Sequence, residues 1–398
     1  RNGRAMSRFV DHVRQTVKHG NPSPVAASAG DHTSAEDANG KVGASGRIPY
    51  KMANYQRTDF QVGSMIGQGS FATVHKAKEI ASGRDVALKI VRPESELDFG
   101  VGPNGSSPGV SYEDVLKAMK LEVQHVEALG IHPNIVQILG TAEDCRVFAM
   151  ERAATDLYTL VKQQPNLPLV LAKQWTGNVL AAVVHMHDMG VVHQDIKSSN
   201  LLIFADKTAK VCDFGLAREG ADSMPVDREL VTLWYRPPEL LMGDTAYTPK
   251  VDEWGVGCVV LEMVLGASPF RGKPDCVCSC PQITHRNYNS DQLMKIFATM
   301  GSPREQALLS RMACAGHFAK WPVFPRKLDA LMHKHCTPER LAKGRGISPD
   351  ALNVEEAVAQ WTSLVAGLLH LDPARRFSAR DALARDIFDP DPPPSASR

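Results

Sequence analysis

The strongest constraint on this chain comes from two short segments, VHQDIKSSN and VCDFG. The first contains Asp195, Lys197 and Asn200, and the second places Asp213 directly before a Phe-Gly pair. A carboxylate, an ammonium group and an amide at this spacing can serve a hydroxyl, a phosphate and a magnesium ion, and Asp213 adds another oxygen ligand. Both segments in this order indicate phosphoryl transfer, which needs positioning and charge neutralisation more than covalent chemistry.

A glycine-rich segment lies upstream, between two apolar runs that predict strands. Gly67 and Gly69 allow the backbone to approach phosphate oxygens, which a Cβ atom would obstruct. Ala72 stands where the usual pattern has its third glycine, so the segment by itself also fits a plain hairpin turn. The residues of this predicted phosphate loop are Ile66, Gly67, Gln68, Gly69, Ser70, Phe71, Ala72, Thr73 and Val74.

Lys89 follows in the apolar run VALKI, on a predicted strand from which its ammonium group can reach phosphates. A lone lysine in an apolar strand would usually extend its amine to the sheet edge. Here Glu122 is a candidate partner, on a helix predicted from about residue 113 to 129. The helix is predicted because apolar residues recur on one face, while Glu113 and Glu127 are expected to be solvated. These apolar residues are Leu116, Met119, Val123, Val126 and Leu129.

Together these segments resemble eukaryotic protein kinases, over a region from roughly Thr58 to Phe388. The segments VTLWYRPPE, DQLMKIF and MGSP are similar to the activation-segment ending and C-lobe insert of the group that contains cyclin-dependent kinases and MAP kinases. No Thr-x-Tyr pair occurs between Gly215 and Thr232, so the chain is identified as cyclin-dependent kinase-like. The resemblance implies a Ser/Thr kinase of the CMGC group that uses ATP and Mg²⁺.

The resemblance also implies an α+β, bilobal protein kinase fold. Its small N-lobe is an antiparallel sheet with one main helix, and its larger C-lobe is mainly helical. The kinase domain is expected over residues 57–388, with the N-lobe at 57–153 and the C-lobe at 154–388. Residues 1–56, which include a stretch rich in Ala, Gly, Ser and Asp, and residues 389–398 are expected to be disordered or flexible.

The resemblance assigns chemical roles residue by residue. Asp195 would accept or orient the proton of the substrate hydroxyl, and Lys197 would neutralise charge on the γ-phosphate. Asn200 and Asp213 would hold magnesium, since hard oxygen ligands suit that ion.

The remaining nucleotide contacts follow from the same resemblance. Lys89, held by Glu122, would fix the α- and β-phosphates. The other implied contacts are Ile66, Val74, Ala87 and Leu202 with the adenine, Met150 as gatekeeper, the hinge backbone at Glu151 and Ala153, and Asp156 with the ribose.

Two further elements implied by the family are structural. Asp252, in an Asp-x-Trp element, would anchor the catalytic loop. Glu239 and Arg376 match a buried ion pair that ties the activation segment to the C-lobe.

The activation segment predicts which substrates the chain selects. In this group of kinases, the arginine of Trp-Tyr-Arg bonds a backbone carbonyl, which here pairs Arg236 with Val231. A substrate N–H at that pocket would lose its acceptor, at a cost of about 1–3 kcal/mol when buried. Proline has no N–H to leave unpaired. Protein substrates with Ser/Thr-Pro sites are therefore expected.

Departures from the family pattern are concentrated where cyclin-dependent kinases read a phosphothreonine with three arginines. Asp227 occupies the phosphorylated position, Gln194 and Leu121 replace two of the arginines, and Arg218 remains. One hypothesis is that Asp227 pairs weakly with Arg218 and that phosphorylation is not needed. The rival hypothesis is that these losses mark weakened catalysis.

The partner is less defined than the chemistry. The helix segment VLKAMKLE differs from the cyclin-binding signature, so a cyclin-like activator is implied by family only and autonomous activity stays open. An insertion at residues 93–111 contains GPNGSSPG and predicts a mobile loop, or a contact surface where related kinases dock their activator.

A pseudokinase scaffold is the alternative class of protein, encouraged by Ala72 and Gln194, although neither removes a catalytic group. Nucleic-acid and membrane partners are not expected, because the net charge is +1, no basic stripe occurs, and apolar stretches such as 258–265 are interrupted by a charge. No signal-peptide pattern opens the sequence, and a cytoplasmic and/or nuclear location is expected.

The chain has eight cysteines, which are expected to stay reduced. Three of them, Cys276, Cys278 and Cys280, alternate with single residues, and His285 lies nearby. A structural zinc site is one interpretation, but the spacing fits no standard pairing of two-residue gaps. A solvent-facing loop is the alternative. Further candidates along the chain are Cys314, His317, His333, His335 and Cys336.

Overall fold

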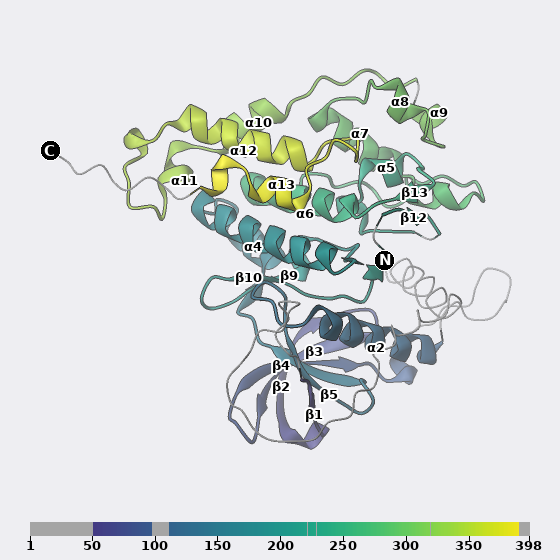
Figure 1. Cartoon of the computed structure of the whole chain (residues 1–398), viewed down its shortest axis with the longest axis vertical. Helices are drawn as coiled ribbons and strands as arrows, with labels where there is room; N and C mark the ends of the chain where they lie inside the picture. Colours follow the sequence, from purple (N-terminus) through teal and green to yellow (C-terminus); the bar gives the residue numbers. More distant parts are fainter. Residues whose placement is uncertain (1–50, 98–110, 221, 228, 319, 390–398) are drawn as a thin grey trace, which may run out of the picture. The chain divides into compact units, whose positions relative to one another are not determined.

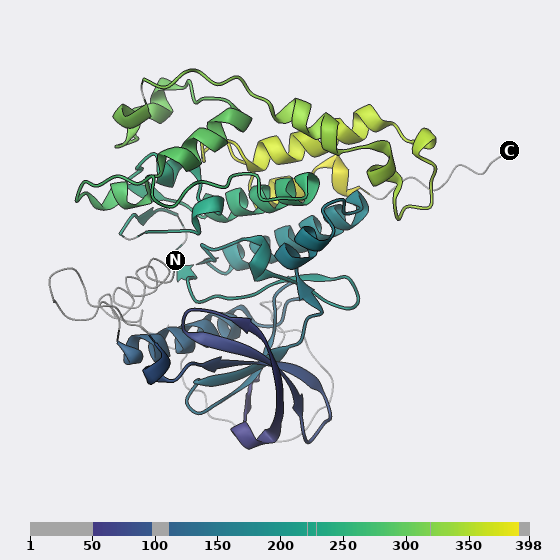
Figure 2. The same ribbon diagram turned by 180° about the vertical axis from the view of Figure 1, so that it is seen from behind.

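The chain divides into two compact units, here termed the N-lobe and the C-lobe (Figures 1 and 2). The N-lobe is Arg1–Ile131 with Gln137–Glu151, and the C-lobe is His132–Val136 with Arg152–Arg398. The computed structural model describes residues 51–97, 111–220, 222–227, 229–318 and 320–389. Residues 1–50, 98–110 and 390–398 lie outside the described residues. The predictions of disorder for the two termini and of a mobile loop in the middle of the insertion concern these residues.

The N-lobe contains a six-stranded sheet with the order β1-β5-β6-β4-β3-β2. Its strands are β1 (Ala53–Asn54), β2 (Phe60–Gln68), β3 (Ala72–Glu79), β4 (Asp85–Val91), β5 (Ile138–Ala142) and β6 (Val147–Glu151), with 3₁₀ turns η1 (Arg57–Asp59) and η2 (Glu94–Glu96). All neighbouring pairs are antiparallel except β1 with β5. Apolar residues of several strands, including Phe60, Val86 and Leu88, form its buried core.

Residues 53–56 depart from the expectation of a disordered extension that reaches residue 56. β1 pairs in parallel with β5, and the Tyr55 N–H donates to the Thr141 carbonyl at 2.8 Å. The approach is close enough to require Gly140, because a Cβ atom there would lie 2.3 Å from the Ala53 carbonyl oxygen. A strand of two residues is too short to carry a periodic signal, so this edge strand depends on its tertiary partner.

The predicted helix of the N-lobe is confirmed as α2 (Tyr112–Leu129), which lies alongside the sheet in Figure 1. It begins with a capping box, in which Ser111 and Asp114 exchange side-chain and backbone hydrogen bonds of 3.0 and 3.2 Å. The predicted apolar face is buried except for Leu116, which is half-buried, and Val115 and Ala118 extend the buried face. The buried face is therefore shifted slightly around the helix from the one that the sequence predicts.

The C-lobe is mainly helical, as expected. Its helices are α3 (Leu157–Gln163), α4 (Leu169–Asp188), α5 (Pro238–Leu241), α6 (Lys250–Leu265), α7 (Ser290–Met300), α8 (Gln306–Leu309), α9 (Ala315–Phe318), α10 (Leu328–His335), α11 (Pro338–Ala342), α12 (Val354–Leu368) and α13 (Ala379–Leu383). Both views show α4, α6, α12 and α13 packed side by side (Figures 1 and 2). Among the described residues, no helix combines the length and apolarity needed to cross a membrane.

Short strands and 3₁₀ turns position the functional loops of the C-lobe. The strands are β7 (Thr155–Asp156), β8 (Val191–Val192), β9 (Leu201–Ile203), β10 (Ala209–Val211), β11 (Arg218–Glu219), β12 (Met224–Pro225) and β13 (Ala246–Tyr247). The turns are η3 (Ser198–Asn200), η4 (Leu233–Tyr235), η5 (Ile283–Asn287), η6 (Pro349–Ala351) and η7 (Asp386–Phe388). β9 pairs with β7 and β10, β8 with β11, and β12 with β13.

α6 is the centre of the C-lobe core. All its residues from 251 to 264 are buried, as expected of a helix that is apolar on every side. It packs directly on the catalytic loop, since a Cβ atom on Gly255 would lie 2.8 Å from the Ile196 carbonyl oxygen. The predicted ion pair is also present: the Arg376 guanidinium donates to both Glu239 carboxylate oxygens at 2.8 and 2.7 Å. This fork geometry suits a buried arginine.

Candidate active site

The glycine-rich segment forms the hairpin between β2 and β3. Gly67 pairs with Val74, and the Gly69 N–H donates to the Ala72 carbonyl at 2.8 Å. Cβ atoms added at Gly67 and Gly69 would make only ordinary contacts, at 3.6 and 3.5 Å. The fold itself therefore does not require glycine at these two positions. Close approach of a ligand to the backbone is a physical reason for it.

Lys89 lies on β4, opposite Val74 of β3 and Phe148 of β6. Its Nζ donates to both oxygens of Glu122 on α2, at 2.8 and 2.6 Å. The predicted pairing is therefore formed within the N-lobe. Both side chains are largely shielded from water, with 16% and 7% of their areas exposed. The Lys89 ammonium also lies 5.5 Å from the centroid of the Phe148 ring.

The other predicted nucleotide contacts are distributed over both lobes. Ala87 pairs with Met150, and Glu151 lies opposite Val86 at the end of β6. Ile66 is 47% exposed, so it is not part of the N-lobe core. The phosphate loop, Ala87, Lys89, Glu122, Met150 and Glu151 belong to the N-lobe, whereas Ala153, Asp156, Asp195, Lys197, Asn200, Leu202 and Asp213 belong to the C-lobe.

Asp156, predicted to contact the ribose, also caps the helix α3. Its Oδ1 accepts the Thr159 N–H at 2.8 Å and its Oδ2 accepts the Thr159 hydroxyl at 2.7 Å. These bonds cap the N-terminus of α3. Leu202 lies beside Asp156, because β7 pairs with β9. The C-lobe thus fixes one polar and one apolar side chain of the predicted nucleotide site next to each other.

Asp252 of α6 anchors the catalytic loop, as predicted. The two carboxylate oxygens accept the N–H groups of His193 and Gln194, both at 2.8 Å. Gln194 has a φ of 65°. This is a left-handed conformation that a non-glycine residue adopts only when its surroundings impose it. The buried carboxylate provides that constraint and thereby sets the direction of the next residue, Asp195.

The Asp195 carboxylate is surrounded by donors. Lys197 donates to its Oδ2, and the Thr232 hydroxyl donates to its Oδ1 at 2.6 Å. The Lys197 ammonium also donates to the Thr232 hydroxyl at 3.2 Å. Thr232 was not among the predicted site residues, because no local pattern reveals a contact across 37 residues of chain. It links the catalytic loop to the end of the activation segment.

Asn200 and Asp213 are held close to Asp195 through backbone contacts. The Asn200 side-chain N–H groups donate to the Asp195 carbonyl at 2.9 Å and to Asp195 Oδ2 at 3.3 Å, which holds the amide beside the carboxylate. The Asn200 carbonyl in turn accepts the Cys212 N–H at 3.0 Å. Asp213 follows with a φ of 66° and an exposed side chain. These two oxygen donors fit a hard divalent cation such as Mg²⁺.

Phe214 fixes the segment on the other side of Asp213. Its ring is buried and packs edge-on against the His193 ring, with centroids 4.9 Å apart. An Nε2 contact of 3.1 Å joins His193 to the Cys212 carbonyl. The residues before and after Asp213 are therefore both tied to the catalytic loop.

Arg236 captures two consecutive carbonyls of the activation segment. Its Nε donates to the Leu230 carbonyl at 2.9 Å and its Nη2 to the Val231 carbonyl at 3.3 Å. The predicted contact with Val231 is thus formed. Val231 has a φ of 59°. This conformation is strained for a β-branched residue and costs on the order of 1–3 kcal/mol. The buried guanidinium offsets this strain.

Asn287 of η5 supports the same segment and was not predicted. Its side-chain oxygen accepts the Leu230 N–H at 2.7 Å, and its carbonyl accepts Nη1 of Arg236 at 2.9 Å. It lies in the insert after α6, where the sequence has no pattern that points to the activation segment. Only the folded arrangement reveals this role.

Asp227 and Arg218 form the predicted pair, with 2.9 Å between Oδ2 and Nη1. The Arg218 guanidinium also interacts electrostatically with the Tyr247 side chain. The Tyr247 hydroxyl accepts the side-chain N–H of Gln194 as well. A chain of contacts therefore runs from Gln194 of the catalytic loop through Tyr247 and Arg218 to Asp227.

A comparison with known proteins agrees with the kinase interpretation of this geometry. The family model described as "Protein kinase domain" matches residues 60–388, and the chain therefore belongs to the protein kinase family. Cyclin-dependent kinase 14 from Callithrix jacchus is 31% identical over 335 residues, which cover 82% of this chain and 67% of the relative. Within the protein kinase family, this chain is a cyclin-dependent kinase-like protein of the CMGC group.

Two other relatives give similar figures. Cyclin-dependent kinase 14 from Homo sapiens is 31% identical over 335 residues, covering 82% of this chain and 61% of the relative. The protein of the same name from Xenopus laevis is 31% identical over 334 residues, covering 82% and 65%. The matched region thus spans 61–67% of the length of these relatives.

His187, at the end of α4, is a further residue that the sequence did not single out. Its Nε2 lies 2.9 Å from Asp252 Oδ2, and its Nδ1 lies 3.5 Å from Glu253 Oε1. Burial lowers the pKa of His187, but the hydrogen bonds and charges of Asp252 and Glu253 outweigh it and raise the pKa to about 10. A protonated histidine therefore helps to hold the carboxylate that anchors the catalytic loop.

We predict that His187→Gln removes a pH-dependent part of the stability. Because the folded pKa of about 10 exceeds the unfolded value of 6.5, the stabilisation is fully present below pH 6.5 and is lost as pH rises towards 10. The difference in unfolding free energy between wild type and variant should shrink by at most about 1.4 kcal/mol per pH unit in that window. Urea denaturation between pH 6 and pH 10 measures it.

The control for the substitution is His333→Gln, which changes an exposed histidine of α10. A difference between wild type and His187→Gln that stays constant from pH 6 to pH 10 would contradict the prediction.

Proposed function

We propose that this chain is an active, Mg²⁺- and ATP-dependent protein serine/threonine kinase that phosphorylates Ser/Thr-Pro sites in proteins. The observation that carries the proposal is the cluster around Asp195. A carboxylate, an ammonium group and a hydroxyl converge there on a loop that a buried carboxylate holds in a strained conformation. Such a cluster is suited to receive a substrate hydroxyl and to stabilise charge as phosphate is transferred.

In this proposal each residue acts through its own chemistry. Asp195 orients the substrate hydroxyl and accepts its proton, and Lys197 offsets negative charge on the transferred phosphate. Asn200 and Asp213 hold Mg²⁺, which when bound neutralises phosphate charge. Lys89, oriented by Glu122, binds the α- and β-phosphates.

The adenosine part of the proposed site follows the family pattern. Apolar side chains bind the adenine, hinge backbone groups bind its edge, and Asp156 binds the ribose. The apolar residues are Ile66, Val74, Ala87, Met150 and Leu202, and the hinge groups are those of Glu151 and Ala153.

Activity of the chain without a cyclin is part of the proposal. In protein kinases, positioning of the helix that carries the glutamate controls whether the lysine–glutamate pair is formed. Here the pair between Lys89 and Glu122 is formed within a single chain, at 2.6 Å. The segment that ends at Thr232 is also anchored internally, by Arg236 and Asn287.

We predict that the purified chain alone transfers phosphate from ATP to a Ser-Pro peptide in the presence of Mg²⁺, and that EDTA abolishes the transfer. Asp195→Asn should lower kcat by at least about 100-fold, the smallest effect usual for a general base. Asp206→Asn, at an exposed carboxylate between β9 and β10, is the control and should retain activity. Equal turnover by Asp195→Asn, or no turnover by the wild type, would favour the scaffold alternative.

Specificity for proline rests on the carbonyls that Arg236 captures. With the carbonyls of Leu230 and Val231 both bonded to the guanidinium, neither is directed to a substrate N–H. A substrate residue with an N–H at that position leaves it unpaired, at a cost of about 1–3 kcal/mol if buried. Proline avoids the cost because it has no N–H.

We predict that kcat/KM for a Ser-Pro peptide exceeds that for the matched Ser-Ala peptide by about 5- to 150-fold, the ratio equivalent to about 1–3 kcal/mol. The two peptides differ in a single residue, so a steady-state kinase assay isolates the effect. Equal values, or a preference for the Ser-Ala peptide, would remove this part of the proposal.

Asp227 is proposed to replace a phosphothreonine permanently. Its carboxylate pairs with Arg218, which is the arginine retained from the usual set of three. The position of a second arginine is occupied by Gln194, whose neutral amide bonds Tyr247 instead. A single carboxylate needs fewer cationic partners than a phosphate dianion, so the three changes are consistent with one another.

We predict that Asp227→Ala lowers kcat/KM by about fivefold, since a partly exposed ion pair contributes up to about 1 kcal/mol. Asp222→Ala removes the same charge from an exposed position in the same segment and should have no effect. Peptide phosphorylation and thermal unfolding measure both variants. Unchanged activity and stability in Asp227→Ala would make this contact irrelevant to function.

A further inference from the structure

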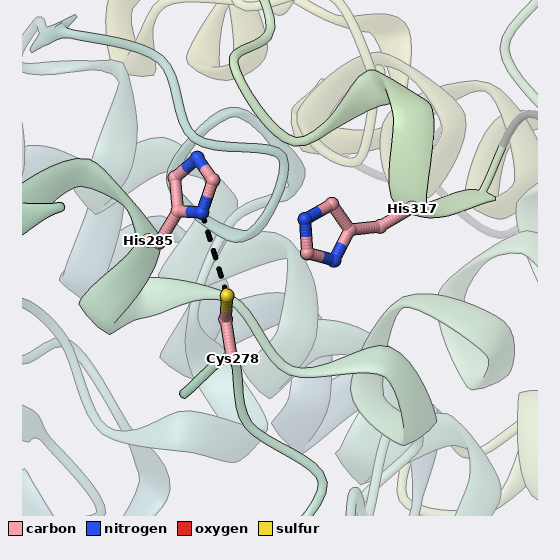
Figure 3. Close-up of side chains that lie close together, drawn as sticks. All are labelled: Cys278, His285 and His317. Atoms are coloured by element: carbon pink, nitrogen blue, oxygen red, sulfur yellow. Dashed lines mark hydrogen bonds between the residues drawn. The ribbon is translucent and has the colours of Figure 1, made fainter. Parts of the chain in front are cut away.

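Four metal-ligating side chains from three segments of the C-lobe gather beside α9. Cys278 and Cys280 lie before η5, His285 lies within η5, and His317 lies on α9. Figure 3 shows the sulfur of Cys278 and the rings of His285 and His317 directed towards one another. One ligand atom from each of these three residues lies within 4.8 Å of the other two.

Cys280 lies beside two of these residues, Cys278 and His285. Its Sγ lies 3.1 Å from Sγ of Cys278 and 2.7 Å from Nδ1 of His285, while Cys278 Sγ lies 3.4 Å from the same nitrogen. In a tetrahedral zinc site with the usual bond lengths, ligand atoms lie about 3.4–3.8 Å apart. The 3.4 Å between Cys278 Sγ and the His285 nitrogen already matches this spacing, whereas Cys280 Sγ would have to move away from His285 and towards His317 to reach it. The donor set is two thiols and two imidazoles.

The position of His317 is set by contacts that do not involve the thiols. Its N–H donates to the Cys314 carbonyl at 3.0 Å, and its ring packs on Tyr288 with centroids 4.7 Å apart. His285 is buried, whereas His317 is exposed. The cluster therefore has one buried imidazole, two half-buried thiols and one exposed imidazole, and the exposed side provides the entry path that a metal ion needs.

We propose that Cys278, Cys280, His285 and His317 form a structural zinc site. Thiolate and imidazole ligands select zinc over magnesium or calcium, which prefer oxygen, and four protein ligands leave no open position for catalysis. Zinc binding displaces the two thiol protons. Bonds from the ion to the thiolates and imidazoles then replace the weak hydrogen bonds that the thiols make. The Cys-x-Cys spacing departs from the common two-residue gap, but His317 of α9 supplies the ligand that the local sequence lacks.

Two competing interpretations of the cluster make different predictions. In one, the thiols only form a weak hydrogen-bond chain to His285. In the other, Cys278 and Cys280 oxidise to a disulfide, for which their sulfurs would have to move from 3.1 Å to covalent bonding distance. Neither interpretation gives the site a defined metal content.

The site is connected to the activation segment through η5. His285 is two residues before Asn287, whose side chain accepts the Leu230 N–H and whose carbonyl accepts an N–H of Arg236. A metal ion that fixes His285 therefore restricts the short turn that supports residues 230 and 231. This consequence concerns local stability and does not depend on the proposed enzymatic activity.

Metal content tests the proposal directly. The full chain, purified in the presence of a non-thiol reductant, incubated with zinc and desalted, should retain about one zinc per chain by mass spectrometric elemental analysis. The double variant Cys278→Ser with Cys280→Ser should retain none, and His317→Ala should bind zinc at least about tenfold more weakly. Cobalt titrated into the metal-free wild type should give the absorption bands of a thiolate-ligated, tetrahedral ion.

The control double variant, Cys145→Ser with Cys276→Ser, removes the same number of thiols and should retain its zinc. Zinc loss from this control, a full complement in the Cys278/Cys280 double variant, or fewer than about half an equivalent in the wild type would overturn the assignment. A wild-type mass lower by two hydrogens under the same conditions would also overturn it, because a disulfide consumes two ligands.

Hydrogen exchange tests the structural consequence without any activity assay. Removal of zinc by a chelator should speed exchange of the Leu230 amide, which donates to Asn287, and should leave the N-lobe amides unchanged. Unchanged exchange at Leu230 would show that the ion does not support η5. Because this readout involves no phosphoryl transfer, its failure is distinguishable from a failure of the proposed kinase function.

Discussion

A buried carboxylate, that of Asp252, sets the geometry on which the C-lobe site depends. It lies on α6, a helix buried on every side, where an ion without partners would be strongly destabilising. Its oxygens are satisfied by the N–H groups of His193 and Gln194 and by the protonated ring of His187. The catalytic loop can supply these hydrogen bonds to Asp252 only if two consecutive backbone N–H groups point to the same side chain. Gln194 therefore adopts a left-handed conformation, which sets the direction of the next residue, Asp195.

The same residue, Gln194, connects this anchor to the activation segment. Its backbone is held by Asp252, while its side chain bonds the Tyr247 hydroxyl, which also interacts electrostatically with Arg218. A second connection runs through Thr232, whose hydroxyl bridges Asp195 and Lys197. The catalytic loop and the activation segment are thus joined at two points by neutral or singly charged groups. This arrangement supports the proposal that Asp227 replaces a phosphothreonine.

The sequence predicted the elements whose signal is local. α2 follows from its apolar periodicity, and Lys89 and Glu122 follow from motifs whose pairing the family resemblance supplies. Residues 53–56 could not be predicted, because a two-residue strand has no periodicity and forms only against β5 and Gly140. Contacts between distant segments escaped prediction for a related reason: His187, Thr232 and Asn287 each act on residues far away in the chain. The thiol spacing alone disfavours a zinc site for the same reason, because α9 brings His317 to the cluster only in the fold.

Two of the left-handed residues of the C-lobe, Gln194 and Val231, are stabilised in the same way. Gln194 and Val231 are both left-handed non-glycine residues, and each is held by a buried charged side chain, Asp252 or Arg236. Strain of on the order of 1–3 kcal/mol persists only where surrounding contacts over-determine the conformation. Arg236 is itself held by the Asn287 carbonyl and by Glu229, and the Asn287 side chain also bonds the Leu230 N–H. The insert after α6 is therefore a structural support of the activation segment, and a metal ion at His285 would act on that support rather than on the reacting groups.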